Sequence, residues 1–131
     1  MVDKKNIKNI YGLSPMQEGM LMHTVYGDSP LAYFEQTRYR ITGDLDIAIF
    51  TDTWQMIVQR HDIFRSIFVY ENVPKPIQIV LKERLMPIEV LDFTSLAPDK
   101  ISAKVEEEVL LDRSQPFHLT KDHLMRMKII K

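Results

Sequence analysis

The chain of 131 residues has no cysteine, only four glycines and no long apolar run. The lack of cysteine excludes a disulfide framework and thiolate chemistry, and so few glycines leave no glycine-rich loop for binding phosphate. No apolar stretch approaches the roughly 18 to 20 residues of a membrane span, and the N-terminus lacks the apolar segment of a secretory signal. We therefore expect a cytoplasmic protein that does not enter the membrane.

A charge imbalance is also absent. Seventeen Lys and Arg residues oppose eighteen Asp and Glu residues, which leaves a formal net charge of −1. Such a balance gives no global attraction to nucleic acid or to an anionic membrane, so neither is favoured as a partner. Apolar residues make up 45% of the chain, and its length suits one domain with a hydrophobic core.

Motifs for catalysis and metal binding are missing as well. The four histidines lack the H-x-x-x-H or H-E-x-x-H spacing, with a nearby carboxylate, that is typical of a metal site. Ser14 has no G-x-S-x-G surroundings, which excludes a nucleophile elbow. The sequence therefore assigns no catalytic, cofactor-binding or metal-binding residue. The histidines are His23, His61, His118 and His123.

The sequence does contain a strong helix start in the stretch "LSPMQEGMLMH". The Ser14 side chain can accept a hydrogen bond from the Gln17 backbone N–H while the Gln17 side chain reaches back to Ser14. Pro15 stands where a missing N–H costs nothing. This capping box predicts a helix over 15–26, which the following "GDSP" ends.

Helix and strand patterns alternate along the rest of the chain. The clearest period follows the expected cap Asp46, where apolar residues from Ile47 to His61 recur three, four and seven positions apart and predict a second helix. The interspersed order predicts an α+β or mixed α/β fold. Strands are expected at 34–42, at two short stretches around a proline-containing turn within 66–81, at 87–93 and at 123–131, and a third helix is expected at 98–115.

The two ends of the chain carry different expectations. Before Tyr11 the sequence is a polar, lysine-bearing lead for which no element is predicted. Pro74 and Pro76 place the expected hairpin at an edge or rim of a sheet. The last expected strand runs to residue 131, whereas domains usually end in polar loops. We therefore expect an incomplete sheet and one lobe of a larger fold.

"RHDIFRSIF", residues 60–68, is unusual because a charged cluster leads directly into an apolar strand. Arg60, His61, Asp62 and Arg65 fall at the end of the second expected helix. They can be charged residues that cap the C-terminus of a helix and interact with its dipole. Alternatively, Arg65 reaches a buried carboxylate elsewhere in the fold. The residues alone leave both interpretations open.

Two motifs together resemble the opening of a condensation domain from a nonribosomal peptide synthetase. "YGLSPMQEGMLMH" carries the family pattern S-x-x-Q-x-x-[LM], and "QRHDIFRSIF" carries R-H-[ED]-x-[LF]-R-[ST]-x-F. "FEQTRYRITGDLD" and "QPFHLTKDHLMRMKI" are also similar to the family, so the resemblance covers essentially the whole chain. The matching residues are Ser14, Gln17, Met20 or Leu21, Arg60, His61, Asp62, Phe64, Arg65, Ser66 and Phe68.

The resemblance implies one lobe of a chloramphenicol-acetyltransferase-like two-lobe fold, with a mixed β-sheet packed against helices. It assigns 13–131 to the N-terminal lobe and 1–12 to a lead that serves in docking. In this family two carrier domains present phosphopantetheine-tethered substrates in a tunnel between the lobes, and a peptide bond forms. The catalytic motif H-H-x-x-x-D-G is absent from the sequence. The resemblance thus implies an inactive part of an enzyme that needs a C-terminal lobe and carrier domains as partners.

The form "LSPMQEG" further resembles condensation domains that receive an intermediate from a separate upstream synthetase. There the opening segment is an acceptor communication-mediating region, which binds a short C-terminal donor helix of the upstream enzyme. The lysines can steer an acidic helix or form an ordinary solvated tail. The hairpin edge at 69–80 is a second candidate surface. The expected docking residues are Lys4, Lys5, Lys8, Tyr11, Leu13, Ser14, Met16, Gln17 and Glu18.

The same resemblance places the first helix under the tunnel, so Met16, Met20 and Leu21 are expected mainly in the core. Three hypotheses stand at this point. The chain is part of an amide-forming enzyme, a docking module without chemistry, or a self-contained binding protein that shares the fold. The first two are compatible with each other, and the paired motifs disfavour the third.

Overall fold

The computed structural model describes residues 3–27 and 31–131. This part of the chain contains three α-helices and five short strands. The helices are α1 (Pro15–Tyr26), α2 (Ile47–Arg60) and α3 (Pro98–Arg113), with short 3-10 helices η1 (Lys4–Asn6) and η2 (Asp62–Arg65). The strands are β1 (Ile7–Gly12), β2 (Ser66–Val69), β3 (Ile77–Leu81), β4 (Ile88–Leu91) and β5 (Met127–Ile130).

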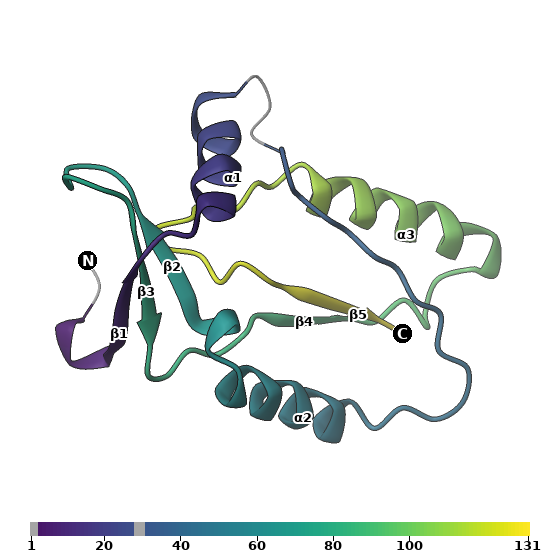
Figure 1. Cartoon of the computed structure of the whole chain (residues 1–131). Coiled ribbons are helices and arrows are strands. Elements are labelled where there is room, and N and C mark those ends of the chain that lie inside the picture. Colours follow the sequence, from purple (N-terminus) through teal and green to yellow (C-terminus); the bar gives the residue numbers. More distant parts are fainter. Residues whose placement is uncertain (1–2, 28–30) are drawn as a thin grey trace.

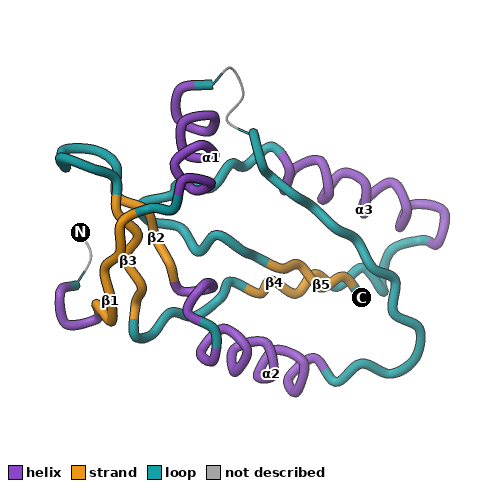
Figure 2. Tube along the Cα trace, viewed as in Figure 1, coloured by secondary structure: helices purple, strands orange, loops and turns teal. Residues whose placement is uncertain are grey.

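The described strands form two small sheets (Figure 1). The first is antiparallel with the order β1-β3-β2, and the second is a parallel pair of β4 and β5. In Figure 2 this pair lies between α2 and α3. Side chains join each helix to this region, because Gln55 donates to the Met86 carbonyl at 2.9 Å and Lys128 donates to Glu108 at 2.9 Å. The fold is therefore α+β with small, incomplete sheets, as expected.

One cluster of core residues lies on one face of the antiparallel sheet. Ile67, Ile79 and Leu81 are almost fully buried there, and Ile7 and Val69 are among the side chains that pack against them. The residues alternate along their strands because every second side chain of a strand faces the same side. The strand register places Ile67 opposite Ile79 and Ile7 opposite Leu81, so the cluster is made of cross-strand pairs.

The two predicted helix starts are confirmed. Ser14 Oγ accepts from the Gln17 backbone N–H at 3.3 Å, and Gln17 Oε1 accepts from the Ser14 backbone N–H at 2.9 Å. Asp46 caps α2 by accepting from the Ile49 backbone N–H at 3.0 Å. The apolar face of α2 includes Val58, which is fully buried. The helix at 98–115, the hairpin within 66–81 and the two later strands are also confirmed, with shorter bounds. The difference is largest for the last strand, which covers only Met127–Ile130 of the expected 123–131.

The strand predicted at 34–42 is wrong. This segment is extended but belongs to neither sheet, and it runs from the region of α1 to α2 along α3 (Figure 1). Gln36 donates to the Val109 carbonyl at 3.1 Å and to Asp112 at 2.9 Å, and Arg38 pairs with Glu106. The alternating pattern therefore serves side-chain contacts with α3 and not strand pairing.

The strand β1 was not expected, because its residues look like a polar lead. It pairs with β3 from Ile7 to Gly12, with a register shift between Ile7 and Asn9. This pairing makes β3 the central strand of the sheet. The hairpin of β2 and β3 was expected at a sheet edge, which is confirmed for β2 and wrong for β3. Pro76 comes just before β3 and interrupts no ladder. The expected division between 1–12 and 13–131 stays a prediction.

The attachment of β1 yields the first testable prediction. The Asn6 side chain donates to the Glu83 carbonyl at 2.9 Å and accepts from the Glu83 backbone N–H at 3.0 Å. Asn6→Ala removes both hydrogen bonds and should lower the free energy of unfolding by about 1 to 2 kcal/mol in urea denaturation. Asn9→Ala is the control, because its side chain makes no hydrogen bond to any described residue. Equal losses in the two variants would contradict the assigned role of Asn6.

Candidate functional site

The second sequence motif is built around a buried cation. Arg65 is 2% exposed and ends η2, the short turn between α2 and β2. Its Nε donates to the Leu81 carbonyl at 2.9 Å, and its Nη1 donates to the carbonyls of Val58, at 2.5 Å, and Gln59. Its Nη2 lies 2.6 Å from Asp62 Oδ1. The carboxylate partner is therefore three residues away, and the expectation of a carboxylate from elsewhere in the fold is wrong.

Asp62 also binds a second cation that the sequence motif does not contain. The Lys8 ammonium on β1 lies 2.8 Å and 3.0 Å from the two carboxylate oxygens of Asp62. This hydrogen bond, with the charges of Lys8 and Arg65, holds the pKa of Asp62 below its usual value. The other two charged residues of the motif, Arg60 and His61, are exposed. Asp62 thus connects the N-terminal strand with the buried arginine.

A path of hydrogen bonds joins the first motif to the second. Gln17 Nε2 donates to Gln78 Oε1 at 2.9 Å, and Gln78 Nε2 donates to Ser66 Oγ at 2.8 Å. The Ser66 hydroxyl then donates to the Asp62 carbonyl at 3.1 Å. Gln78 stands in the middle of this path and was missed by the sequence analysis, because its role depends on the pairing of β3 and has no sequence signal. The two motifs are therefore parts of one structural unit.

The expected docking residues lie at the N-terminal end of α1 and on the strand before it. Tyr11 is 51% exposed and Met16 is 75% exposed. Met16, Met20 and Leu21 were expected in the core. This prediction is wrong for Met16 and Met20, which are exposed, and is confirmed for Leu21, which is buried. The reason is that the described elements cover only one side of α1. The remaining members are exposed or half-buried: Lys4, Lys5, Lys8, Leu13, Ser14, Gln17 and Glu18.

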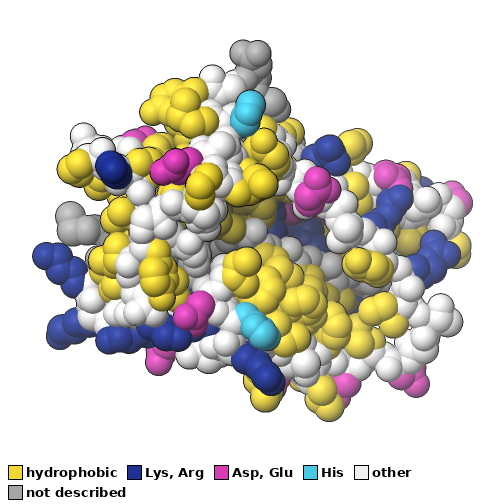
Figure 3. Space-filling view, in the orientation of Figure 1, with side chains coloured by type: hydrophobic (Ala, Val, Ile, Leu, Met, Phe, Trp, Pro, Cys, Tyr) yellow, Lys and Arg dark blue, Asp and Glu magenta, His cyan; other side chains and the backbone are white. Residues whose placement is uncertain are grey.

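Hydrophobic side chains gather over α1 on the face shown in Figure 3. The exposed ones on this helix and the strand before it include Ile10, Tyr11, Met16 and Met20. Ser14 and Gln17 are held in the capping box and Lys8 is held by Asp62, so these three have structural partners already. The surface that is free for contact consists mainly of the apolar residues with Lys4 and Lys5.

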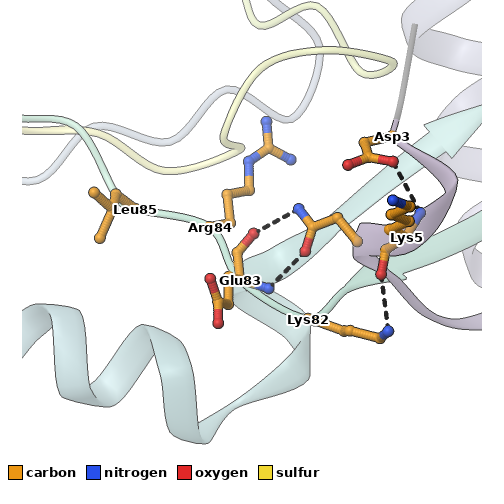
Figure 4. Close-up of a pocket in the computed structure, with 7 residues that line it drawn as sticks. Asp3, Lys5, Lys82, Glu83, Arg84 and Leu85 are labelled. Carbon is orange, nitrogen blue, oxygen red and sulfur yellow. Dashed lines mark hydrogen bonds between the residues drawn. The ribbon is translucent and has the colours of Figure 1, made fainter.

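An open depression of about 510 Å³ lies beside η1 (Figure 4). Its lining groups of both signs are largely bonded to one another or to the backbone. Lys82 donates to the Lys5 carbonyl at 2.8 Å, and Asp3 accepts from the Lys5 backbone N–H at 2.9 Å. Figure 4 shows Arg84 extending away from Asp3 and Lys5. The hydrogen bonds among these lining residues hold η1 against the chain after β3. The residues that line the depression offer no arrangement for catalysis.

The described residues contain no group of three or more histidine, aspartate or glutamate side chains placed to hold a metal ion. The same part of the chain has no helix both long and apolar enough to cross a bilayer. The predicted cytoplasmic location stays a prediction.

Comparison with known proteins agrees with this architecture. The Condensation domain family matches residues 7–131, which include β1. A linear gramicidin synthase of Brevibacillus parabrevis is 42% identical over 130 residues, which are 99% of this chain and 2% of that protein. A plipastatin synthase of Bacillus subtilis (strain 168) is 42% identical over 131 residues, which are the whole chain and 5% of that protein. The chain thus spans a small part of these relatives.

A solved structure shows the same fold. The starter condensation domain of rhizomide synthetase superposes with a TM-score of 0.71 at 24% identity, over 95% of this chain and 30% of that one. The chain belongs to the condensation domain family. It has the fold of part of such a domain, as the resemblance implied.

The shared carboxylate of Asp62 predicts a pH dependence. Its pKa is lowered in the folded chain, so its contribution to stability is present above the unfolded value of about 3.9 and is lost as the pH falls through the lower folded value. Asp62→Asn should therefore be less stable than the parent chain at pH 7, and the difference should shrink below about pH 4. Urea denaturation across this range measures it. The exposed Asp52→Asn is the control, and a difference for Asp62→Asn that stays constant with pH would contradict the prediction.

Proposed function

We propose that this chain is the N-terminal part of a condensation domain that joins carrier-bound aminoacyl or peptidyl groups through a peptide bond. The observation that carries the proposal is the hydrogen-bonded path from Gln17 to Asp62 and Arg65, because it makes one unit of the two family motifs. The names of the relatives, gramicidin and plipastatin synthases, support peptide synthesis as the activity of the larger enzyme.

The proposed reaction is aminolysis of a thioester. The amine nitrogen of the downstream aminoacyl group attacks the carbonyl carbon of the upstream thioester, so a C–N bond forms and the C–S bond breaks. The amine loses a proton and the leaving thiolate gains one. The residues of this chain contribute the scaffold, because the buried guanidinium of Arg65 is turned toward backbone and side-chain partners within it. Phosphopantetheine belongs to the separate carrier domains, and a C-terminal lobe completes the tunnel.

The first prediction of this proposal is that the 131-residue chain alone makes no peptide bond. The H-H-x-x-x-D-G motif is absent from its sequence, and His61 is an exposed helix cap with no hydrogen-bonded carboxylate, among the described residues, that would make it a base. Mixing the chain with loaded donor and acceptor carrier domains should give the uncatalysed rate of dipeptide formation. A complete condensation domain is the positive control. Dipeptide formation above background that His61→Ala abolishes would contradict the proposal.

We further propose that β1 and α1 form an acceptor surface for the C-terminal helix of an upstream synthetase. The exposed apolar side chains Ile10, Tyr11, Met16 and Met20 suit the apolar face of a short amphipathic helix. The Lys8 side chain is held in an ion pair with Asp62, so we assign the steering of an acidic helix mainly to Lys4 and Lys5. A short helix that must order on binding buries little area, so the affinity should be weak, roughly micromolar or poorer.

Docking is testable by titrating the isotope-labelled chain with the C-terminal peptide of the synthetase that precedes it. Chemical shift changes should be confined to 10–20, which include the exposed apolar residues of the proposed surface, and to the hairpin at 69–80. Met16→Gln should weaken binding about tenfold through faster dissociation, because it removes apolar contact area. Added salt should slow association.

Met56→Gln is the matched control, because Met56 is 73% exposed on α2, outside the proposed surface. It should leave the affinity unchanged. No shift at millimolar peptide, in a chain whose spectrum shows a fold, would overturn the docking proposal and leave the scaffold role in place. Docking without any contribution to catalysis in a complete enzyme would favour the alternative of a non-catalytic docking module.

A further inference from the structure

A second cavity, of about 330 Å³, lies between the chain after β3 and the segment that leads into β5. Three basic side chains line it, from Arg84, Lys121 and Arg126, together with His123 and a single acid, Asp122. The Arg126 guanidinium packs 4.5 Å from the ring centroid of Phe117 and is bonded to Asp112 at 2.7 Å, so its charge is already compensated. The cavity belongs to neither motif unit nor docking surface.

Arg84 makes no direct ion pair with any described residue, although the charge of Asp122 acts on it from the same cavity. One of its terminal nitrogens, Nη2, donates to the Lys121 carbonyl. The other, Nη1, is buried and has no hydrogen-bond partner among the described residues. No carboxylate in that part of the chain lies within ion-pair distance of Arg84, and Asp122 instead accepts from the His118 backbone N–H at 2.7 Å. Burial of a cation without an acceptor is unfavourable.

His123 supplies a second donor without an acceptor. The side chain is 6% exposed, and its Nδ1 accepts from the Met125 backbone N–H at 3.3 Å. An imidazole that accepts at Nδ1 carries its proton at Nε2 when neutral. That Nε2 is buried and also lacks a partner among the described residues. Burial lowers the pKa of His123, and the charge of Arg84 lowers it further, so the imidazole stays neutral at pH 7.

We propose that this cavity binds a small oxyanion, a phosphate or carboxylate group, whose oxygen accepts from Arg84 Nη1 and His123 Nε2. Two buried donors, one of them charged, share a cavity with no acceptor of their own among the described residues, and an oxyanion supplies both the acceptor and the missing negative charge. The volume is ample for such a group, since a water molecule occupies only about 30 Å³. Lys121 at the same cavity adds a further favourable charge and Asp122 an unfavourable one, so the basic residues of the lining outnumber its acid.

The test is an NMR titration of the 131-residue chain with sodium phosphate, in parallel with sodium acetate and with sodium chloride at matched ionic strength. Phosphate, acetate or both should give saturable shifts of the His123 ring and raise the His123 pKa, because a bound anion opposes the effect of Arg84. A response to one anion alone identifies the preferred chemistry. Arg84→Met should weaken binding at least tenfold, and Arg113→Met, an exposed arginine at the end of α3, is the matched control.

His123→Leu gives a second, independent variant if Arg84→Met fails to fold, and thermal unfolding then replaces the ring resonance as the readout. The parent chain should melt at a higher temperature with phosphate than with chloride, and the variant should lose that increment. Shifts of the same size in chloride would show general screening, and no shift up to about 50 mM anion would show affinity too weak for a site. Either result would overturn the proposal.

Discussion

The guanidinium of Arg65 is almost fully removed from water, and its bonds go to the end of α2, to the end of β3 and to η2. A cation in this position requires acceptors on every side, so it fixes where those three elements end. Two of the carbonyls, from Val58 and Gln59, lack the usual partners inside the helix because α2 ends there. Arg65 therefore closes the C-terminus of one helix and holds it against the sheet.

The surrounding residues extend this constraint to the N-terminus. Asp62 offsets the charge of Arg65 and also binds Lys8, which fixes β1 against the motif. Ser66 and Gln78 carry the connection to Gln17 at the start of α1. Family motifs that lie far apart in the sequence thus meet in one scaffold. A partner that binds at β1 or α1 would contact elements held by the same network that holds Arg65.

Local signals were enough to predict much of this structure. The capping box at Ser14, the cap at Asp46 and the period of α2 depend on neighbouring residues, and each was confirmed. The wrong predictions concern segments whose structure depends on residues far away in the sequence. The alternating segment at 34–42 faces α3 instead of a strand. Strand β1 forms because β3 offers an edge to a segment in which lysine and asparagine stand between the strand formers Ile7, Ile10 and Tyr11.

In the candidate site, too, local patterns could be predicted from the sequence and contacts between distant residues could not. Its motif residues were recognised from sequence, but the contact from Lys8 to Asp62 and the position of Gln78 follow from strand pairing, which no short pattern encodes. Met16 and Met20 were assigned to the core from the family resemblance and from helical spacing, yet neither reveals whether a second element of this chain covers that face. Recognition of the family therefore located the site and did not supply its contacts.

The account depends most on the structural role of Arg65, and the free energy of unfolding of Arg65→Ala tests it directly. Loss of the guanidinium leaves three carbonyls without their donor and empties a buried site, so we expect a loss of about 3 to 5 kcal/mol in urea denaturation of the 131-residue chain. The neighbouring Arg60→Ala, at an exposed position, should change stability by less than about 0.5 kcal/mol. Equal and small effects of the two substitutions would contradict the account.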